Sequence, residues 1–508
     1  MKVYLSVDLG AGSGRVIAGK SDFSEGHTDH EYLEIEELHR FDNNNAELPG
    51  GYFWDIIGIY RNIVEGIRKG VDKYGDAVQS VGIDTWGCDF GLISGNGNLL
   101  TIPRQYRDPR SEGMGEEIDR IIGQDKVYSL TGVSPAFYNT SEHLLAQVKS
   151  KSSALTEAKD LLFISDLLAY WLTGLKATER TIASTSQLYS PATQDWAWEV
   201  IEALGIPKCI FGRIHDPGTI LGKTRPELDG KIGMSGLTVV NSPQHDTASA
   251  VAGIPIGASS EDKDAVDVWV SSGTWSIMGV ELDQPILTQE AKALGFANET
   301  GVDNSIRFLK NISGLWMIQE CRRHWQTEGT DYNYAALVEL ASQAEPFTAF
   351  VDPDDPMFST PGNMPGKIVE YLEKTGQPVP ELKGTILRIA TESIALKYRL
   401  VFEQLEELIQ NSLGKKLGKV YMGGGGIQNV MLAQNAANAI GREVVAGPIE
   451  ATSCGNLITQ MVALGDLPDT AAGRDLILRS NDIKHYLPDD AATWETQVAR
   501  FKTIIQNK

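Results

Sequence analysis

The chain has 508 residues, more than one hydrophobic core normally organises, which predicts two domains. Its 42% apolar and 22% charged residues are typical of a folded, water-soluble protein. The formal net charge of −22 weighs against nucleic acids and anionic membranes as partners, because such a surface repels both.

The N-terminal residues and the cysteines indicate in which compartment the protein is expected. The first ten residues, MKVYLSVDLG, alternate like a strand and carry a single lysine before the first acid, unlike a signal peptide. No apolar run approaches the ~20 residues that a membrane-spanning helix needs, so we expect a cytoplasmic protein. Cys88, Cys209, Cys321 and Cys454 are scattered singly, without the spacing of a zinc site or a disulfide framework. We expect four reduced and mostly buried thiols.

A strand, a glycine-rich turn and a second strand open the chain. Residues 4–7 are the first predicted strand, residues 8–14 (DLGAGSG) the turn, and residues 16–18 the second strand. In Rossmann and P-loop proteins the glycine turn opens a helix instead. The glycine spacing here is not G-x-G-x-x-G, and G-x-x-x-x-G-K-[ST] is absent from the chain. The turn therefore belongs to another architecture.

The same pattern recurs in the second half of the chain. Residues 266–270 (VDVWV) predict a strand, residues 271–274 a turn of small residues, and residues 275–280 a further strand. The recurrence predicts a duplicated architecture with one copy in each half. We place the domains at residues 1–254 and 255–508, with the boundary near residues 253–264, where small and charged residues separate two apolar segments.

Helical and strand patterns alternate between these turns. Asp55 is the predicted N-cap of a helix that runs to about Lys69, and a strand at residues 78–83 follows. Apolar residues spaced by three or four from Leu387 to Leu408 predict a long amphipathic helix. Such alternation indicates the α/β class.

The long helix is flanked by two further features. Residues 352–365 (DPDDPMFSTPGNMP), rich in Pro, Asp and Gly, are interpreted as a long surface loop. After the helix we expect a strand at residues 419–422, four glycines at residues 423–426, and another helix through Ala439.

Three turns with glycine are candidates for phosphate binding: residues 10–15, 272–274 and 423–426. Glycine lets backbone N–H groups approach a phosphate because no Cβ stands in the way. A single such turn is more often only a tight hairpin. Three at strand ends, one of them opening a helix whose N-terminus favours anions, predict a nucleotide site.

Two aspartates beside these turns each allow two interpretations. Asp8 can face Mg²⁺ through water, or it can simply cap the turn. Asp246, in SPQHDT before a helical stretch at residues 248–252, can be a helix N-cap or a general base that takes a proton from a sugar hydroxyl. A helix N-terminus would lower the pKa of Asp246, which phosphoryl transfer tolerates because positioning and charge stabilisation dominate it.

A third acidic segment lies where the strand at residues 78–83 ends. Asp84, Gly87 and Asp89 suit a polyol, since carboxylates accept hydroxyl hydrogens and the Trp86 indole can pack on C–H groups. A hairpin with exposed acids explains the same residues equally well.

Taken together, DLGAGSGR, GIDTWGCDFGLI, YRDPR, HDTASAV, SSGTWS, LKNISGLWMIQE and MGGGGIQN resemble the FGGY carbohydrate kinases over essentially the whole chain. GIDTWG, HDTASAV and GPIEATSCGN set it apart from glycerol kinases and xylulokinases. The resemblance implies two actin-like ATPase (ribonuclease H-like) domains with an interdomain cleft. It also implies transfer of the γ-phosphate of ATP, with Mg²⁺, to O1 of L-rhamnulose in L-rhamnose catabolism, with L-fuculose or L-xylulose as alternative ketoses.

The resemblance also implies roles for single residues. The first phosphate loop corresponds to Ala11, Gly12, Ser13, Gly14 and Arg15, and further nucleotide contacts to Thr274, Gln319 and Gly425. The proton acceptor corresponds to Asp246, and sugar contacts to Gly87, His245, Asp246, Thr247 and Asn311. Gly12 stands where the family usually has Ser, so a side-chain hydroxyl donor is lost while the backbone N–H remains. The loss bears on the affinity for the nucleotide and not on the activity itself.

An alternative of another class is a non-catalytic actin-like protein that binds ATP for assembly or regulation. It would lack the HDT carboxylate and would carry polymerisation or partner surfaces. Asp246 is present and no basic or apolar tail is visible, which favours the kinase. The expected partners are therefore a ketose and ATP, with no nucleic acid and no membrane; the sequence does not predict the oligomeric state.

Overall fold

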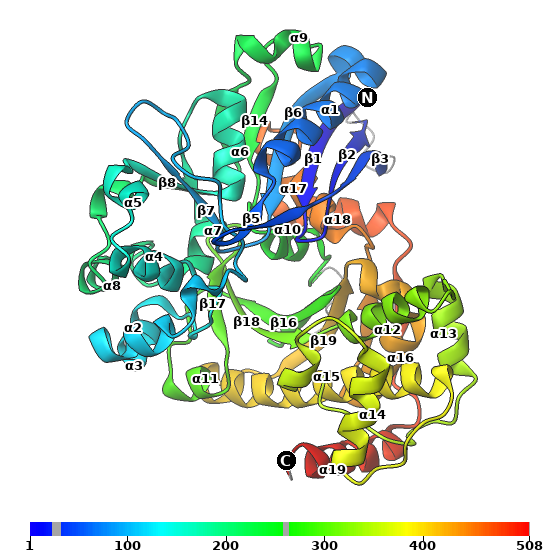
Figure 1. Cartoon of the computed structure of the whole chain (residues 1–508). Coiled ribbons are helices and arrows are strands. Elements are labelled where there is room, and N and C mark those ends of the chain that lie inside the picture. Colours follow the sequence, from blue (N-terminus) through cyan, green and yellow to red (C-terminus); the bar gives the residue numbers. More distant parts are fainter. Residues whose placement is uncertain (23–31, 258–263, 507–508) are drawn as a thin grey trace. The chain divides into compact units, whose positions relative to one another are not determined.

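The computed structural model describes residues 1–22, 32–257 and 264–506, and it divides into two compact units (Figure 1). The first unit consists of Met1–Ala258, Glu281–Phe308 and Ala451–Ser480. The second consists of Ser259–Val280, Leu309–Glu450 and Asn481–Lys508. The boundary predicted near residues 253–264 lies partly outside the described residues.

A six-stranded sheet forms the centre of the first unit. Its strands are β1 (Lys2–Leu9), β2 (Ser13–Ser21), β3 (Leu33–Asp42), β6 (Val78–Thr85), β13 (Thr219–Lys223) and β14 (Thr238–Asn241), in the order β13-β14-β6-β1-β2-β3. β1 is antiparallel to β2 and parallel to β6, and β14 is parallel to β6 and antiparallel to β13. The sequence predicted the β1–turn–β2 unit correctly.

Helices cover both faces of this sheet, which is why the central strand β1 is buried along nearly its whole length. Alternate side chains of β1 point to opposite faces. Leu5 packs with α1 (Ile56–Tyr74), whereas Tyr4 packs with α17 (Ala451–Ala463). As predicted, Asp55 caps α1, its carboxylate accepting from Gly58 N at 3.0 Å, and the helix extends past the predicted end at Lys69.

A group of helices between β6 and β13 has its own apolar core. It contains α2 (Met114–Ile122), α3 (Gln124–Thr131), α4 (Thr140–Lys149), α5 (Ser153–Glu157) and α8 (Trp198–Ala203). Phe163, Leu144 and Ile201 are fully buried in this core. β7 (Phe90–Ile93) pairs with β8 (Asp160–Phe163), and α6 (Ile164–Thr173) begins where β8 ends.

A second sheet forms the centre of the second unit. Its strands are β15 (Val266–Ser272), β16 (Trp275–Leu282), β18 (Ile306–Ser313), β19 (Leu417–Gly423), β20 (Val444–Ala446) and β21 (Lys484–Tyr486). Within the unit the order is β18-β16-β15-β19-β20-β21. β15 is antiparallel to β16 and parallel to β19, and β20 is parallel to β19 and antiparallel to β21.

The two sheets share one plan. The β15–β16 hairpin corresponds to the β1–β2 hairpin, and β19, β20 and β21 correspond to β6, β14 and β13 in position and relative direction. The predicted α/β class and the duplicated strand–turn–strand architecture are therefore confirmed. This repeated plan agrees with two actin-like domains.

The helices of the second unit are α12 (Trp316–Thr327), α13 (Tyr334–Ser342), α14 (Met364–Lys374), α15 (Lys383–Leu413), α16 (Val430–Ile440) and α19 (Ala491–Gln506). α15 is the predicted long helix, and residues 352–363 form the predicted loop apart from a short turn at Pro356–Phe358. The expectation that the glycines at 423–426 open a helix directly is wrong. A 3-10 turn (Gly425–Gln428) intervenes because Asn429 caps α16, accepting from Leu432 N at 3.0 Å.

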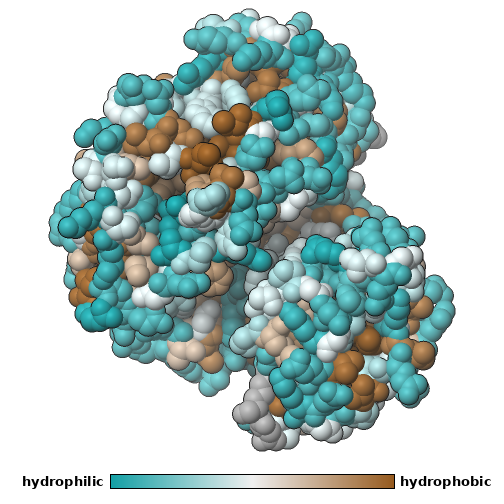
Figure 2. All heavy atoms as spheres, viewed as in Figure 1, coloured by the Kyte–Doolittle hydropathy of each residue, from teal (hydrophilic) through white to brown (hydrophobic). Residues whose placement is uncertain are grey.

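Surface and core follow the expected partition of side chains. Hydrophilic residues prevail on the face drawn in Figure 2, with smaller groups of hydrophobic residues between them. Cys88, Cys321 and Cys454 are buried and Cys209 is exposed. Within residues 1–22, 32–257 and 264–506, no helix combines the length and the apolar character that crossing a bilayer requires.

Candidate active site

The HDT segment lies at the end of β6 in the first unit. Thr85, the last residue of β6, forms a parallel bridge with His245, and its N–H donates to Gln244 O at 2.8 Å. α10 (Asp246–Gly253) starts directly after His245. Gly87 follows β6 and packs on Thr185, which its added Cβ would approach to 3.0 Å. The structure thus brings the end of β6 and three predicted sugar-site residues, His245, Asp246 and Thr247, to one edge of the sheet.

Asp246 is the first residue of α10, and its side chain is 32% exposed. One carboxylate oxygen, Oδ1, accepts from Thr247 N at 2.6 Å and from Thr247 Oγ1 at 3.1 Å. The N-cap position belongs to His245, and no side-chain cap bond is formed there. The interpretation of Asp246 as a plain N-cap is therefore wrong. The carboxylate is held in one orientation and remains accessible to a ligand.

The pKa of Asp246 is raised above 3.8, contrary to the expectation that a helix N-terminus lowers it. Loss of hydration is the main cause, and the negative charge of Asp8 adds to it, whereas His245 and Thr247 oppose the rise. Loss of hydration outweighs the helix terminus because most of the side chain is enclosed. A raised pKa gives this carboxylate more affinity for a proton than an ordinary aspartate has, which suits a general base.

α10 is held against α17 at very short range. A Cβ added to Gly253 would lie 2.0 Å from Ala451 O, and one added to Gly455 would lie 1.8 Å from Ser249 O. Only glycine permits these two backbones to approach so closely. The crossing places the first turn of α17 on the same side of the sheet as the helix that begins with Asp246.

Asp8 lies at the end of β1 and is buried. Its Oδ2 accepts from Arg15 Nη2 at 2.5 Å and from Ser453 Oγ of α17 at 3.4 Å. The turn that follows is closed by a bond from Gly10 N to Ser13 O at 3.0 Å instead. The turn-capping interpretation of Asp8 is therefore not what the structure shows.

Asp84 is fully buried beside Asp8, since the two residues are register partners on neighbouring strands. Its Oδ2 accepts from Asn456 Nδ2 at 2.5 Å, while its Oδ1 has no hydrogen-bond partner within the described residues. Burial raises the pKa of Asp84 well above its usual range, and Asp8 adds to the rise. A cation beside Asp84 would favour its ionised form, which burial and Asp8 disfavour.

This donor set fits Mg²⁺. The ion takes oxygen ligands and usually keeps several waters, binding through one or two carboxylates plus substrate phosphates. Asp8 and Asp84 provide such oxygens, and the unpaired Asp84 Oδ1 is one of them. In the described part of the chain, no cluster of three or more His, Cys, Asp or Glu side chains has the geometry of a self-sufficient metal site. The pair therefore suits an ion held largely by phosphate and water.

Asp89 and Trp86 belong to the interior rather than to an open sugar surface. Asp89 Oδ2 accepts from Trp54 Nε1 at 2.6 Å, Trp86 Nε1 at 2.8 Å and Tyr106 N at 3.2 Å. The Trp86 ring lies 4.2 Å from that of Trp54, and burial raises the pKa of Asp89 to about 7. The alternative of a hairpin with exposed acids is also wrong, because β6 and β7 do not pair and both Asp84 and Asp89 are buried.

The first glycine turn leaves an open position at Gly12. Ala11 and Gly12 are exposed, and a Cβ added to Gly12 would meet no atom within 4 Å. Gly14 is enclosed, since its Cβ would lie 2.3 Å from Phe41 Cζ. Asn43 braces the turn, its Nδ2 donating to Gly10 O at 2.7 Å. The turn is therefore exposed at residues 11 and 12 and held in place at Gly10.

Three of the predicted nucleotide residues, Thr274, Gln319 and Gly425, lie in the second unit. Thr274 Oγ1 donates to Gln319 Oε1 at 3.0 Å, which connects the β15–β16 turn to α12. A Cβ added to Gly424 would lie 2.7 Å from Ser272 O, so the turn after β19 packs on the same hairpin, while Gly425 itself is open. Thr274, Gln319 and Gly425 thus lie around one end of the sheet.

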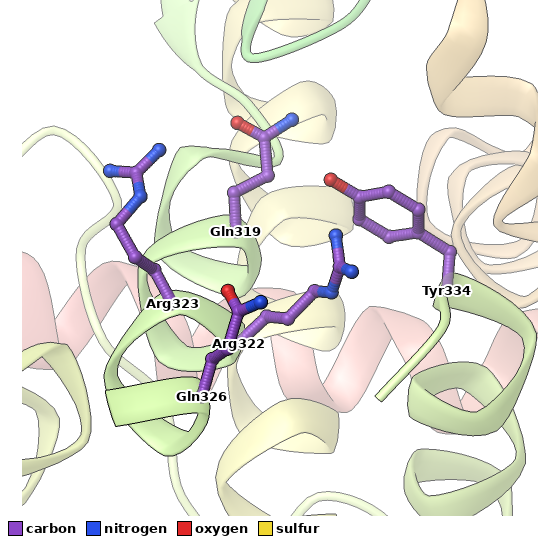
Figure 3. A pocket seen from close by; sticks show the side chains of 5 residues that line it. All are labelled: Gln319, Arg322, Arg323, Gln326 and Tyr334. Carbon is purple, nitrogen blue, oxygen red and sulfur yellow. The ribbon is translucent and has the colours of Figure 1, made fainter. Parts of the chain in front are cut away.

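A pocket of about 220 Å³ adjoins this group on α12 and α13 (Figure 3). Gln319, Arg322, Arg323, Gln326 and Tyr334 line it. The Arg322 side chain points toward Tyr334, with its guanidinium carbon 5.0 Å from the ring centre, whereas Arg323 extends to the other side (Figure 3). A polar, positively charged pocket beside Gln319 suits an anionic ligand with hydrogen-bonding groups.

The remaining predicted sugar residue, Asn311, is exposed on β18 in the second unit, whereas Gly87 and the HDT segment belong to the first. Sequence reasoning missed Ser453 and Asn456, which bind the buried carboxylates. Both lie in GPIEATSCGN, whose polar residues at helical spacing were the available signal. Glu299 and Arg307, which contact His245, carried no local signal.

The FGGY family of carbohydrate kinases provides matching models for both halves of the chain. Its N-terminal domain model matches residues 3–253, and its C-terminal domain model matches residues 268–464. These matches cover both glycine turns of the hairpins and the HDT segment.

The chain is similar to proteins named rhamnulokinase over nearly its full length. It is 42% identical to that of Bacteroides thetaiotaomicron, covering 99% of both chains, and 39% identical to that of Oceanobacillus iheyensis, covering 95% and 97%. Solved structures share the fold at low identity. A ligand-bound xylulose kinase from Lactobacillus acidophilus aligns with a TM-score of 0.79 at 15% identity, covering 100% of this chain and 98% of that one. A glycerol kinase from Plasmodium falciparum with ADP aligns with a TM-score of 0.76 at 15% identity and the same coverage.

Proposed function

Because the chain belongs to the FGGY family of carbohydrate kinases, we propose that it is a rhamnulokinase, which transfers the γ-phosphate of ATP to O1 of L-rhamnulose. The substrate follows from relatives of that name, which are 33–42% identical over nearly the full length. The observation that carries the proposal is the HDT segment. Asp246 has one oxygen fixed by Thr247 and a partly exposed carboxylate beside the end of β6.

Asp246 is proposed as the general base. Its carboxylate orients the acceptor hydroxyl and takes the proton as the oxygen bonds to the γ-phosphorus. Thr247 keeps the carboxylate in position by donating to Oδ1 from its N–H and its hydroxyl. The raised pKa of Asp246 favours proton uptake. Gly87, His245 and Asn311 are proposed as sugar contacts by the match to the family motifs.

The nucleotide is proposed to use backbone donors and the pocket in Figure 3. Ala11 and Gly12 are exposed and offer backbone N–H groups for the phosphates, and Ser13, Gly14 and Arg15 complete the loop that matches the family. Thr274, Gln319 and Gly425 supply further contacts. The pocket at Gln319 and Arg322, which suits an anionic ligand, is proposed for part of the nucleotide.

Mg²⁺ is proposed to be held by Asp8 and, beside it, Asp84, together with phosphate oxygens and water. When bound, it neutralises charge on the transferring phosphate. Asp8 and Asp84 would supply two carboxylates beside the phosphates that the cation also binds. The cytoplasmic location and the domain boundary stay predictions from the sequence.

The ketose is tested with an ADP-release assay over L-rhamnulose, L-fuculose and L-xylulose, with water alone as the blank acceptor. We expect the highest kcat/KM for L-rhamnulose, and phosphorus–carbon coupling in the product's NMR spectrum should place the phosphate on O1. A higher kcat/KM for another ketose would reassign the substrate. No ADP release with any ketose would contradict the kinase activity itself.

Gly12→Ser is expected to lower KM for ATP by roughly 2- to 10-fold without changing kcat, because one added hydrogen bond contributes about 0.5–1.5 kcal/mol. The position has room, since no atom lies within 4 Å of an added Cβ. Gly12→Ala is the matched control, adding the carbon without the hydroxyl. If the Ser and Ala variants gave the same KM, the missing hydroxyl would not limit nucleotide binding.

A further inference from the structure

A buried arginine and a carboxylate stand behind His245 in the first unit. Arg307, on β18, is fully buried. Its Nη2 donates to Glu299 Oε2 at 2.9 Å, and its Nε donates to Thr300 O at 3.0 Å. Glu299, on β17 (Ala297–Thr300), places the same Oε2 3.1 Å from His245 Nδ1. One carboxylate oxygen, Oε2, thus accepts from Arg307 and also faces the imidazole of His245.

This contact determines which nitrogen of His245 carries hydrogen. A carboxylate only accepts hydrogen bonds and a guanidinium only donates them, so a protonated Nδ1 satisfies Glu299, whereas a bare Nδ1 would face its negative charge. Arg307 Nη2 also lies near Nδ1, at 3.2 Å, but Glu299 Oε2 is the closer of the two groups, at 3.1 Å. A second carboxylate oxygen, Asp246 Oδ1, faces Nε2 at 3.4 Å. The contact at Nδ1 is the shorter of the two, so the hydrogen of the neutral imidazole is assigned to Nδ1 and the lone pair to Nε2.

We propose that Glu299, clamped by Arg307, is a positioning residue for phosphoryl transfer, which holds His245 with Nδ1 protonated so that Nε2 can accept the proton that Asp246 receives. The inference rests on the proposed kinase activity. As the hydroxyl oxygen of the ketose bonds to the γ-phosphorus, the bond from phosphorus to the leaving ADP oxygen breaks. The hydroxyl proton passes to Asp246 and is shared with Nε2, and Glu299 balances the imidazolium.

The charges around the pair agree with this arrangement. Burial would raise the pKa of Glu299, but His245 and Arg307 together lower it to about 2, so the carboxylate is ionised at neutral pH. Other charged groups face the same place. Glu179 accepts from Gln244 N at 3.2 Å, and the negative charge of Asp8 acts on Asp246. Among them, Glu299 is the one whose oxygen lies within hydrogen-bonding distance of Nδ1.

Glu299→Gln tests the role because it preserves shape and both contacts but removes the negative charge. Because Oε2 both accepts from Arg307 and faces Nδ1, the amide oxygen would take its place and keep hydrogen on Nδ1, while the charge that balances the imidazolium is lost. We expect kcat to fall by about 100-fold, with KM for ATP changed less than about 3-fold, because the imidazolium formed during proton transfer loses its balancing charge. Nitrogen-15 NMR of histidine-labelled protein, assigned by comparison with His245→Asn, should show hydrogen on Nδ1 of neutral His245 in the wild type and in Glu299→Gln.

Two further variants separate this role from a structural one. Glu281→Gln is the matched control, because Glu281 accepts from Arg474 at 2.7 Å in the same unit and the change is chemically identical. It should keep kcat within about 2-fold. Glu299→Asp retains the charge, so it should keep the Nδ1–H tautomer and recover part of the lost kcat, even where Glu299→Gln lowers the melting temperature.

The outcomes distinguish the inference from the proposed function. A Glu299→Gln protein with wild-type kcat, or a wild-type protein whose neutral His245 carries its hydrogen on Nε2, would overturn the positioning role while leaving the kinase proposal intact. Wild-type protein that phosphorylates no ketose would refute the kinase proposal, and with it the proton transfer. The NMR tautomer would then still decide whether Glu299 sets the state of His245.

Discussion

Replacing Asp246 by Asn is expected to lower kcat by roughly 100- to 10,000-fold, the usual contribution of a general base. The amide has almost the same shape and can still accept from Thr247 N, so the first turn of α10 should persist. KM for ATP and for the ketose should change little, since binding does not require the proton transfer. Steady-state ADP release, with ketose affinity measured by calorimetry, checks both parts.

The pH profile adds a second readout for the same variant. Activity requires the ionised carboxylate, and the pKa of Asp246 is raised above 3.8, mainly by loss of hydration. Activity should therefore be present above this raised pKa and be lost as the pH falls through it, at a higher pH than an ordinary aspartate would give. The acid limb should disappear from the residual activity of Asp246→Asn.

Asp55→Asn is the control for this substitution. Asp55 caps α1, and asparagine is an equally good N-cap, so both stability and kcat should stay near wild type. A variant Asp246→Asn that retained more than about a tenth of wild-type kcat would show that another group accepts the proton.

The features that sequence predicted well are local. β1, its turn and β2, the equivalent β15–β16 hairpin, and the amphipathic helix α15 each follow from neighbouring residues, because strand alternation and helical spacing are short-range patterns. The HDT segment was also found from its own residues. Its placement at the end of β6 and the contacts around Asp246 do not follow from the motif.

The features that sequence missed depend on contacts between distant segments. Asp84 and Asp89 looked alike in sequence, but Asp84 lies beside Asp8 through strand register, and Asp89 is enclosed by Trp54 and Trp86. A motif cannot show such burial. It also could not show that loss of hydration outweighs a helix N-terminus at Asp246, because the enclosing residues come from other elements.

Glu299 illustrates the same limit at the site itself. It is separated from His245 by a long stretch of chain, and its only local context is the short strand β17. Arg307 reaches it because β18 carries the arginine into the interior of the first unit. Removing either partner of a buried ion pair leaves the other charge buried and unpaired, which destabilises the fold. Glu299 and Arg307 therefore each have a structural reason to be present in addition to the role proposed for them.

Gly455→Ala is expected to destabilise the first unit by about 3 kcal/mol or more, at the upper end of the cost of overpacking. The added Cβ would lie 1.8 Å from Ser249 O and 2.7 Å from Gly253 N, both backbone atoms. No rotamer change can relieve a collision with backbone, so α10 and α17 must move apart. Because α10 begins with Asp246 and α17 carries Ser453 and Asn456, activity should fall together with stability.

The matched control is Gly230→Ala in α9 (Asp229–Ile232), where an added Cβ meets no atom within 4 Å. Alanine favours a helix over glycine by up to about 1 kcal/mol, so this variant should be neutral or slightly stabilised. Thermal unfolding followed by circular dichroism should show Gly455→Ala melting several degrees below wild type and Gly230→Ala at or above it. Equal melting temperatures for Gly455→Ala and wild type would mean that the two helices can separate at no cost. In that case the close crossing would not be what holds the first turn of α10, and with it the Asp246 carboxylate, beside the end of β6.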